Sequence, residues 1–275
     1  MADQGKTMQV TPKISYSFLN NSYNLFRTSL ATGRTSRVKV RSMNFSEECS
    51  FREVSKGKLV ITYGKASSRP GNRDLPINHT EYIDTQRDYA VVELPSMSFL
   101  RLKHDSVYTS GYLYIIGGID AEDADCLVET CERLKVETGD WESLDDKLPI
   151  ACFNLSATEC SDSVYVIGGT SYPASSLDII QRLNLDSLVW SILEVRLPIA
   201  GSSILCFRDG SKVIYFILDS KLFSFNTPSL EIEYLKPMPL DLRAESVACY
   251  YSKGFVYASF KESNTTRFKL GDLTQ

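Results

Sequence analysis

The sequence is poor in the residues that most enzymes and metal centres use. Only two histidines, His79 and His104, occur among 275 residues, which excludes a histidine-rich metal site. No Gly-x-Ser-x-Gly elbow, P-loop or dinucleotide-binding fingerprint is found. We therefore expect a protein that is not an enzyme and that uses no metal and no cofactor.

A strong charge of one sign and long apolar runs are also missing. Lys and Arg total 30 against 34 Asp and Glu, giving a net charge of -4 that does not favour nucleic acid or an anionic membrane. No apolar run approaches the ~18 residues of a membrane span, and the first residues lack a signal-peptide pattern. The sequence predicts a cytoplasmic protein whose partners are proteins or peptides, not nucleic acid or membrane.

The cysteines do not form a recognisable framework. Seven occur, without the short regular spacing of a disulfide scaffold or a zinc site. We expect them to be reduced thiols.

Short apolar segments of similar sequence recur six times along the chain. They start at residues 16, 61, 114, 165, 215 and 257, so that successive starts are 45, 53, 51, 50 and 42 residues apart. This period is typical of a four-stranded propeller blade, whereas a helical solenoid repeat has about 34 residues. The chain is therefore predicted to be a β-repeat protein.

The clearest unit begins after Leu148-Pro149. It predicts strands over 154–160, 164–167, 178–184 and 189–193, and the second of these ends in Gly168-Gly169. Glycines are expected there because a chain leaving a crowded strand needs a positive φ or a close backbone approach. Leu197-Pro198 is then expected to open the next unit.

The preceding unit repeats this order, and its Trp141 corresponds to Trp190, 49 residues later. An apolar run ending in Gly-Gly, a Trp near the start of the fourth strand, and Leu-Pro or Met-Pro before the next unit together resemble the kelch repeat. A WD40 propeller is disfavoured because neither Gly-His nor Trp-Asp occurs in the sequence. The diglycine is present in two units, so the resemblance depends on spacing as well as on motif.

The predicted fold class is all-β: a six-bladed β-propeller of four-stranded antiparallel blades, forming one domain over residues 1–275. The blades are expected at approximately 11–45, 46–95, 96–149, 150–198, 199–239 and 240–275. The first unit shows strands over 14–19, 23–30 and 36–41 but no obvious innermost strand. A short N-terminal strand over residues 6–10 is expected to close the ring by completing the last blade; alternatively it belongs to the first blade and the sixth stays three-stranded.

Two long loops between second and third strands are the candidate partner-binding residues. The loop of the second unit is basic and that of the third is acidic, and their candidate residues are Lys65, Arg69 and Arg73, and Asp120, Glu122, Asp123 and Asp125. One hypothesis is a bipolar rim that orients a partner; the alternative is two solvated loops with incidental charge. The acidic loop lacks the spacing and the glycine of a calcium loop, so no metal is predicted.

The recurring aromatic residues are interpreted as packing. Large rings in a shared register bury apolar area between blades, and each hydroxyl needs one polar partner. The residues concerned are Tyr114, Tyr165, Tyr215, Tyr257, Trp141 and Trp190.

The kelch resemblance implies a non-catalytic scaffold or adaptor that binds a protein or peptide through loops on one face. Many kelch proteins are substrate receptors of cullin ubiquitin ligases through an appended BTB or F-box domain. Here the repeats fill nearly the whole sequence, so such a role would need a partner chain. A second alternative is an oxidase or hydrolase with a site at the central channel, and a third is structural participation in a larger complex.

Overall fold

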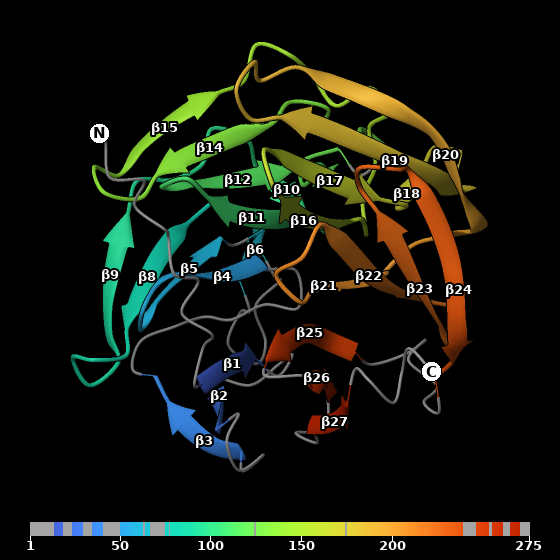
Figure 1. The fold of residues 1–275 in the computed structure, drawn as a ribbon. Coiled ribbons are helices and arrows are strands. Elements are labelled where there is room, and N and C mark those ends of the chain that lie inside the picture. Colours follow the sequence, from blue (N-terminus) through green and yellow to red (C-terminus); the bar gives the residue numbers. More distant parts are fainter. Residues whose placement is uncertain are drawn as a thin grey trace, which may run out of the picture.

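In the computed structural model, the described residues are 14–18, 24–29, 35–40, 50–62, 64–66, 75–76, 78–123, 125–173, 175–238, 246–252, 255–260 and 265–269. The protein is an all-β propeller of antiparallel sheets (Figure 1). The described part of the chain contains no helix with the length and hydropathy that a membrane crossing requires.

Four sheets have the antiparallel layout of complete blades, which we number 2 to 5 by the repeat that forms them. From the inner strand outward, blade 2 has β4 (Ser50–Ser55), β5 (Lys58–Thr62), β8 (Thr80–Asp84) and β9 (Ala90–Leu94), and blade 3 has β11 (Asp105–Thr109), β12 (Tyr112–Ile116), β14 (Glu132–Lys135) and β15 (Asp140–Ser143). Blade 4 has β16 (Ser156–Cys160), β17 (Ser163–Ile167), β19 (Ser175–Asn184) and β20 (Trp190–Gly201), and blade 5 has β21 (Leu205–Arg208), β22 (Val213–Leu218), β23 (Lys221–Asn226) and β24 (Glu231–Pro237).

Two further sheets have three strands among the described residues. They are β1 (Ile14–Phe18), β2 (Asn24–Ser29) and β3 (Thr35–Lys39), and β25 (Ser246–Ser252), β26 (Phe255–Phe260) and β27 (Thr265–Lys269). Short strands lie beside the blades: β6 (Lys65–Ala66) pairs with β7 (Leu75–Pro76), β10 (Arg101–Leu102) with β13 (Ile119–Asp120), and β18 (Thr170–Ser171) with β19.

The sheets follow one another around a centre. Their inner strands are neighbours in the order β4, β11, β16, β21, β25 and β1, and Figure 1 shows the sheets fanning outward from them. Each blade therefore covers a face of the next, which explains why the second strands are apolar on both faces. In β17 all five residues are buried.

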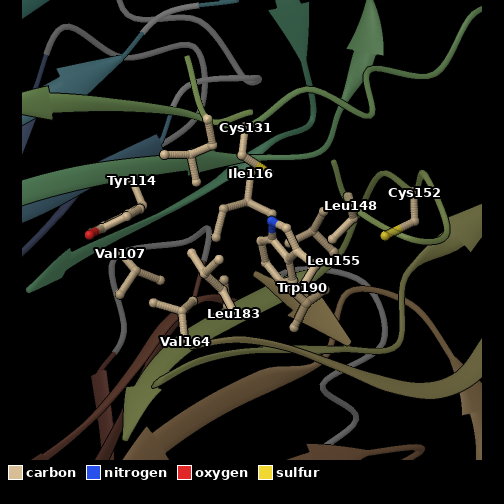
Figure 2. Close-up of a cluster of buried hydrophobic side chains, with 13 residues drawn as sticks. Val107, Tyr114, Ile116, Cys131, Leu148, Cys152, Leu155, Val164, Leu183 and Trp190 are labelled. Carbon is tan, nitrogen blue, oxygen red and sulfur yellow. The ribbon is translucent and has the colours of Figure 1, made fainter. Parts of the chain in front are cut away.

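The core consists of clusters between neighbouring blades. Figure 2 shows the cluster between blades 3 and 4, where Ile116 of β12 meets Leu183 of β19 and Trp190 of β20. A second cluster joins blades 4 and 5 and contains Ile167 and Phe216. Burial of such side chains is the main favourable term in folding, at roughly 1.5–3 kcal/mol for each large side chain.

The structure corrects two predictions about the blades. Six four-stranded blades were expected, but among the described residues four sheets are complete blades and two have three strands. Leu197-Pro198 was expected to open the fifth unit, whereas it lies inside β20, which continues to Gly201. Closure by residues 6–10 concerns residues outside the described ranges and stays a prediction.

Candidate interaction face

One face of the propeller gathers the linkers between blades and the loops after the second strands. In blade 3, Asp105 at the start of β11 pairs with Ile116 at the end of β12. The linker that enters the blade and the loop that leaves its second strand must therefore lie at the same end of the sheet. Blade 4 has the same arrangement, because Ser156 pairs with Ile167.

The diglycines form the joints of this face. Gly117 and Gly168 have φ of +65° and +62°, and Gly118 donates a 2.9 Å hydrogen bond to the carbonyl of Cys152 in the next linker. A Cβ on Gly117 would lie 2.4 Å from that same carbonyl oxygen, so only glycine fits. Both reasons expected from the sequence, a positive φ and a close approach, are confirmed.

Successive linkers are also bonded to one another near the centre. The amide of Asn154 donates to the carbonyl of Lys103 at 3.1 Å, and the amide of Ser203 donates to the carbonyl of Asn154 at 2.7 Å. All three residues have positive φ. The loops on this face are thus mounted on a frame of backbone hydrogen bonds.

The acidic candidates lie together on the blade 3 loop, as the sequence predicts. Asp120 is half-buried, and Glu122, Asp123 and Asp125 are exposed. Two carboxylates shape the loop itself, because Asp120 accepts from the amide of Glu122 at 2.8 Å and Asp123 from that of Asp125 at 3.1 Å. Within the described ranges none of the four is in an ion pair, so their negative charge is open to a partner.

Of the basic candidates, Lys65 alone lies among the residues that the structure describes. Lys65 belongs to β6, which pairs with β7, whereas Arg69 and Arg73 lie outside the described residues. The bipolar rim therefore stays a hypothesis in its basic half.

An aromatic pair on the same face as the acidic loop was missed by the sequence interpretation. The rings of Phe153 and Tyr172 are 6.2 Å apart, and the ammonium of Lys103 lies 5.5 Å from the Phe153 ring centre. Tyr172 is 41% exposed although it is a large aromatic residue. Backbone hydrogen bonds between Phe153 and Thr170 bring the Phe153 and Tyr172 rings together. The only signal in the sequence was the position of Tyr172 shortly after a diglycine.

The recurring tyrosines and tryptophans pack, as expected, where their side chains are described. Tyr114 and Tyr165 are 2% and 4% exposed, and the Tyr114 hydroxyl accepts from Arg133 at 3.2 Å. Trp141 donates its indole N–H to the carbonyl of Pro95, which ties the outer strand of blade 3 to the linker before it. The side chain of Tyr257 is outside the described set.

Neither histidine lies in a cluster that suggests a metal. His104 is buried and its Nε2 is 2.8 Å from Thr62 Oγ1, while His79 Nε2 lies 3.0 Å from Glu81. Among the described residues, no group of three or more His, Cys, Asp or Glu side chains could hold a metal ion.

The polar side chains of the inner strands link blades. Asp105 accepts from Arg52 of β4 at 2.6 Å and from the amide of Ala157 in β16 at 2.8 Å. Its carboxylate is therefore engaged by both neighbouring blades.

Comparison with known proteins agrees with this architecture. No family model matches the chain. An F-box/kelch-repeat protein from Arabidopsis thaliana is 28% identical to it over 150 residues, which cover 54% of this chain and 34% of that protein. The chain resembles a kelch-repeat propeller. This similarity and the kelch-type order of strands, diglycines and tryptophans bear out the resemblance noted in the sequence. The chain spans about a third of this relative's length.

Proposed function

We propose that this kelch-type propeller is a non-catalytic scaffold or adaptor that binds a protein or peptide on the face described above. The observation that carries the proposal is a set of four carboxylates without ion pairs, Asp120, Glu122, Asp123 and Asp125, on a loop whose base is bonded to the linker carrying Phe153. An exposed aromatic ring on the same face as fixed charge, as Tyr172 is here, is typical of recognition surfaces. The similarity to an F-box/kelch-repeat protein supports the same class of function.

The proposal has three further parts, which concern the basic half of the rim, the domain and its location, and the assembly. Lys65, Arg69 and Arg73 form the basic half of the rim, residues 1–275 act as one domain in the cytoplasm, and the protein takes part in a larger complex. No observation favours an oxidase or hydrolase, or a ubiquitin-ligase receptor acting through a partner chain, over the scaffold. On the inner strand β11, Asp105 is held by Arg52 and the amide of Ala157 rather than open to a substrate.

Capture of partners with wild-type and loop-substituted protein tests the proposal. Substitution of the four acidic residues by Asn or Gln, and separately of Tyr172 by Ala, should each lower recovery of a specific partner by at least about tenfold, the effect of one hot-spot residue. Recovery is measured by quantitative mass spectrometry and affinity by calorimetry.

A control removes two acidic charges at the perimeter of the propeller, half the number removed in the loop variant. Glu231→Gln and Glu233→Gln alter exposed residues of the outer strand β24 and should leave recovery unchanged. If the loop variants bind every partner as tightly as the wild type does, the proposed face is wrong.

A further inference from the structure

A buried ion pair lies directly beneath the acidic loop of blade 3. Arg101 of β10 and Glu132 of β14 both have side chains that are 0% exposed, and Arg101 Nη2 is 2.7 Å from Glu132 Oε1. Burial lowers the pKa of Arg101 from its usual value, and the charge of Glu132 opposes that shift. Burying two charges is costly even when they are paired, so stability alone is a weak reason for this pair.

The contacts of Arg101 suggest another reason. Its Nη1 donates to the carbonyl of Gly117 at 3.1 Å, two residues before the acidic loop over 119–129, and to the carbonyl of Thr130 at 2.9 Å, immediately after that loop. One guanidinium group therefore holds both ends of the acidic loop, in the fixed fork geometry of arginine.

Glu132 connects this group to the linker that enters the blade. Its Oε2 accepts from the amide of Ser98 at 2.7 Å, and its Oε1 from the amide of Phe99 at 3.3 Å. Linker, loop ends and ion pair thus form one hydrogen-bonded unit.

Blade 4 provides an internal comparison. Gln181 on β19 corresponds to Glu132, because both pair with the same position of the second strand, one residue before its end. Cys152 corresponds to Arg101, because the Cβ of each lies close to the second glycine of its own diglycine. Gln181 accepts from the amide of Ile150 at 2.8 Å and donates to its carbonyl at 3.0 Å.

The neutral pair of blade 4 therefore holds the linker as Glu132 does, but it does not reach the loop. In the described part of the chain, neither Cys152 nor Gln181 is bonded to the residues that flank the blade 4 loop. Of blades 3 and 4, blade 3 has the longer and acidic loop and carries the charged pair.

We propose that Arg101 and Glu132 are positioning residues that fix the acidic loop of blade 3 in the conformation that meets the partner. This inference rests on the proposed function. A loop that is ordered before binding loses less conformational entropy when the partner arrives, so the pair contributes to affinity without touching the partner.

The test replaces the blade 3 pair by the blade 4 pair. The double variant R101C/E132Q should regain most of the thermal stability that either single substitution loses, because it leaves no unpaired buried charge. Its acidic loop should nevertheless open, because the bonds to the carbonyls of Gly117 and Thr130 are gone.

Hydrogen exchange followed by NMR separates the two effects. Val128 donates to the carbonyl of Gly118 at 2.9 Å, and the equivalent Leu177 of blade 4 donates to Gly169 at 2.9 Å. In the double variant the Val128 amide should exchange at least about tenfold faster than in the wild type, with Leu177 unchanged.

Two results would overturn the inference: wild-type protection at Val128 in the folded double variant, or equal acceleration at Leu177. If the double variant does not fold, the exchange of Val128 and Leu177 is compared in R101K instead. This variant keeps the positive charge but loses the planar fork of arginine. Exchange is measured without a partner. The two proposals can therefore fail separately. If Val128 exchanges faster in the double variant but the four-site loop variant still recovers its partner normally, the proposed function is refuted and the positioning of the loop by Arg101 and Glu132 still holds.

Discussion

At the scale of single residues, two positions show how tightly the blade joints constrain the chain. Gly117 has φ of +65° and its Cα faces the Cys152 carbonyl and the Leu155 side chain. Gly111, in the turn between β11 and β12, also has a positive φ, of +84°, but no heavy atom lies near the position of an added Cβ. Substitutions at these two glycines therefore distinguish the cost of backbone strain, present at both, from the cost of a steric clash, present only at Gly117.

Gly117→Ala should destabilise the protein by more than Gly111→Ala. A left-handed alanine costs about 1–2 kcal/mol in either place, and only at residue 117 must the next linker also move. Urea denaturation should show a lower midpoint for both variants, with the larger decrease for Gly117→Ala. Equal decreases would mean that the joint is looser than the structure indicates.

His104 is a second residue whose environment has a measurable consequence. Burial, followed by the positive charge of Arg101 and a smaller effect of Arg52, lowers its pKa from 6.5 to about 3. The folded protein therefore holds His104 neutral, whereas the unfolded chain protonates it at mildly acidic pH. The stabilisation is fully present above the unfolded pKa and is lost as pH falls toward 3.

The free energy of unfolding of the wild type should therefore fall relative to that of His104→Gln as pH decreases from 6.5. The expected slope is up to about 1.4 kcal/mol per pH unit. Denaturation series at several pH values measure the difference between the two proteins. A difference that stays constant from pH 6.5 to 4 would show that His104 titrates normally.

At the scale of elements, the strands that the sequence predicted well are those with an unambiguous local pattern. The strand expected over 164–167, followed by Gly168-Gly169, became β17, and the strand expected over 154–160 became β16. The outer strand β20 was predicted too short because Leu197-Pro198 looked like a break. Pro198 is exposed on the outermost strand of blade 4, where a missing N–H interrupts no inner ladder.

The candidate site shows the same division. The acidic loop could be predicted because its residues are adjacent in the sequence. The pairing of Phe153 with Tyr172 could not be predicted, nor could that of Arg101 with Glu132, which are 31 residues apart and meet only in the folded blade. Nothing in the local pattern indicates that a charged residue at position 101 or 132 is fully buried.

At the scale of the whole molecule, contacts between inner strands join blades that no single repeat could hold together. Asp105 of blade 3 is bonded to Arg52 of blade 2 and to the amide of Ala157 of blade 4. Ser50 and Ser106, whose Oγ atoms are 2.6 Å apart, add a second bond between blades 2 and 3. In a propeller each blade is stabilised largely by its neighbours, so such links favour cooperative unfolding.

Asp105→Ala should lower the free energy of unfolding by about 2 kcal/mol, because it leaves the Ala157 amide and the Arg52 guanidinium without this acceptor. Asp186→Ala, at an exposed turn position of blade 4, is the matched control and should have almost no effect. Thermal and urea denaturation followed by circular dichroism measure both variants. Equal stability of the two would mean that Asp105 contributes nothing to the junction of the three blades.

The thiols also follow from the molecular packing. The five cysteines whose side chains are described are free, and burial raises the pKa of Cys131, Cys152 and Cys206 to about 12. The expectation of reduced thiols is confirmed for those five.

The amino-acid sequence by itself determined the repeat period, the glycine stops, most second and third strands and the acidic loop, since each depends on residues close together in the chain. Tertiary structure decided which sheets have four strands, where the inner strands meet and which charged groups are buried. These three features depend on contacts between repeats. The geometry of those contacts is set by the way neighbouring sheets pack and exclude water from each other's faces. The same packing placed Phe153 against Tyr172 and Arg101 beneath the acidic loop.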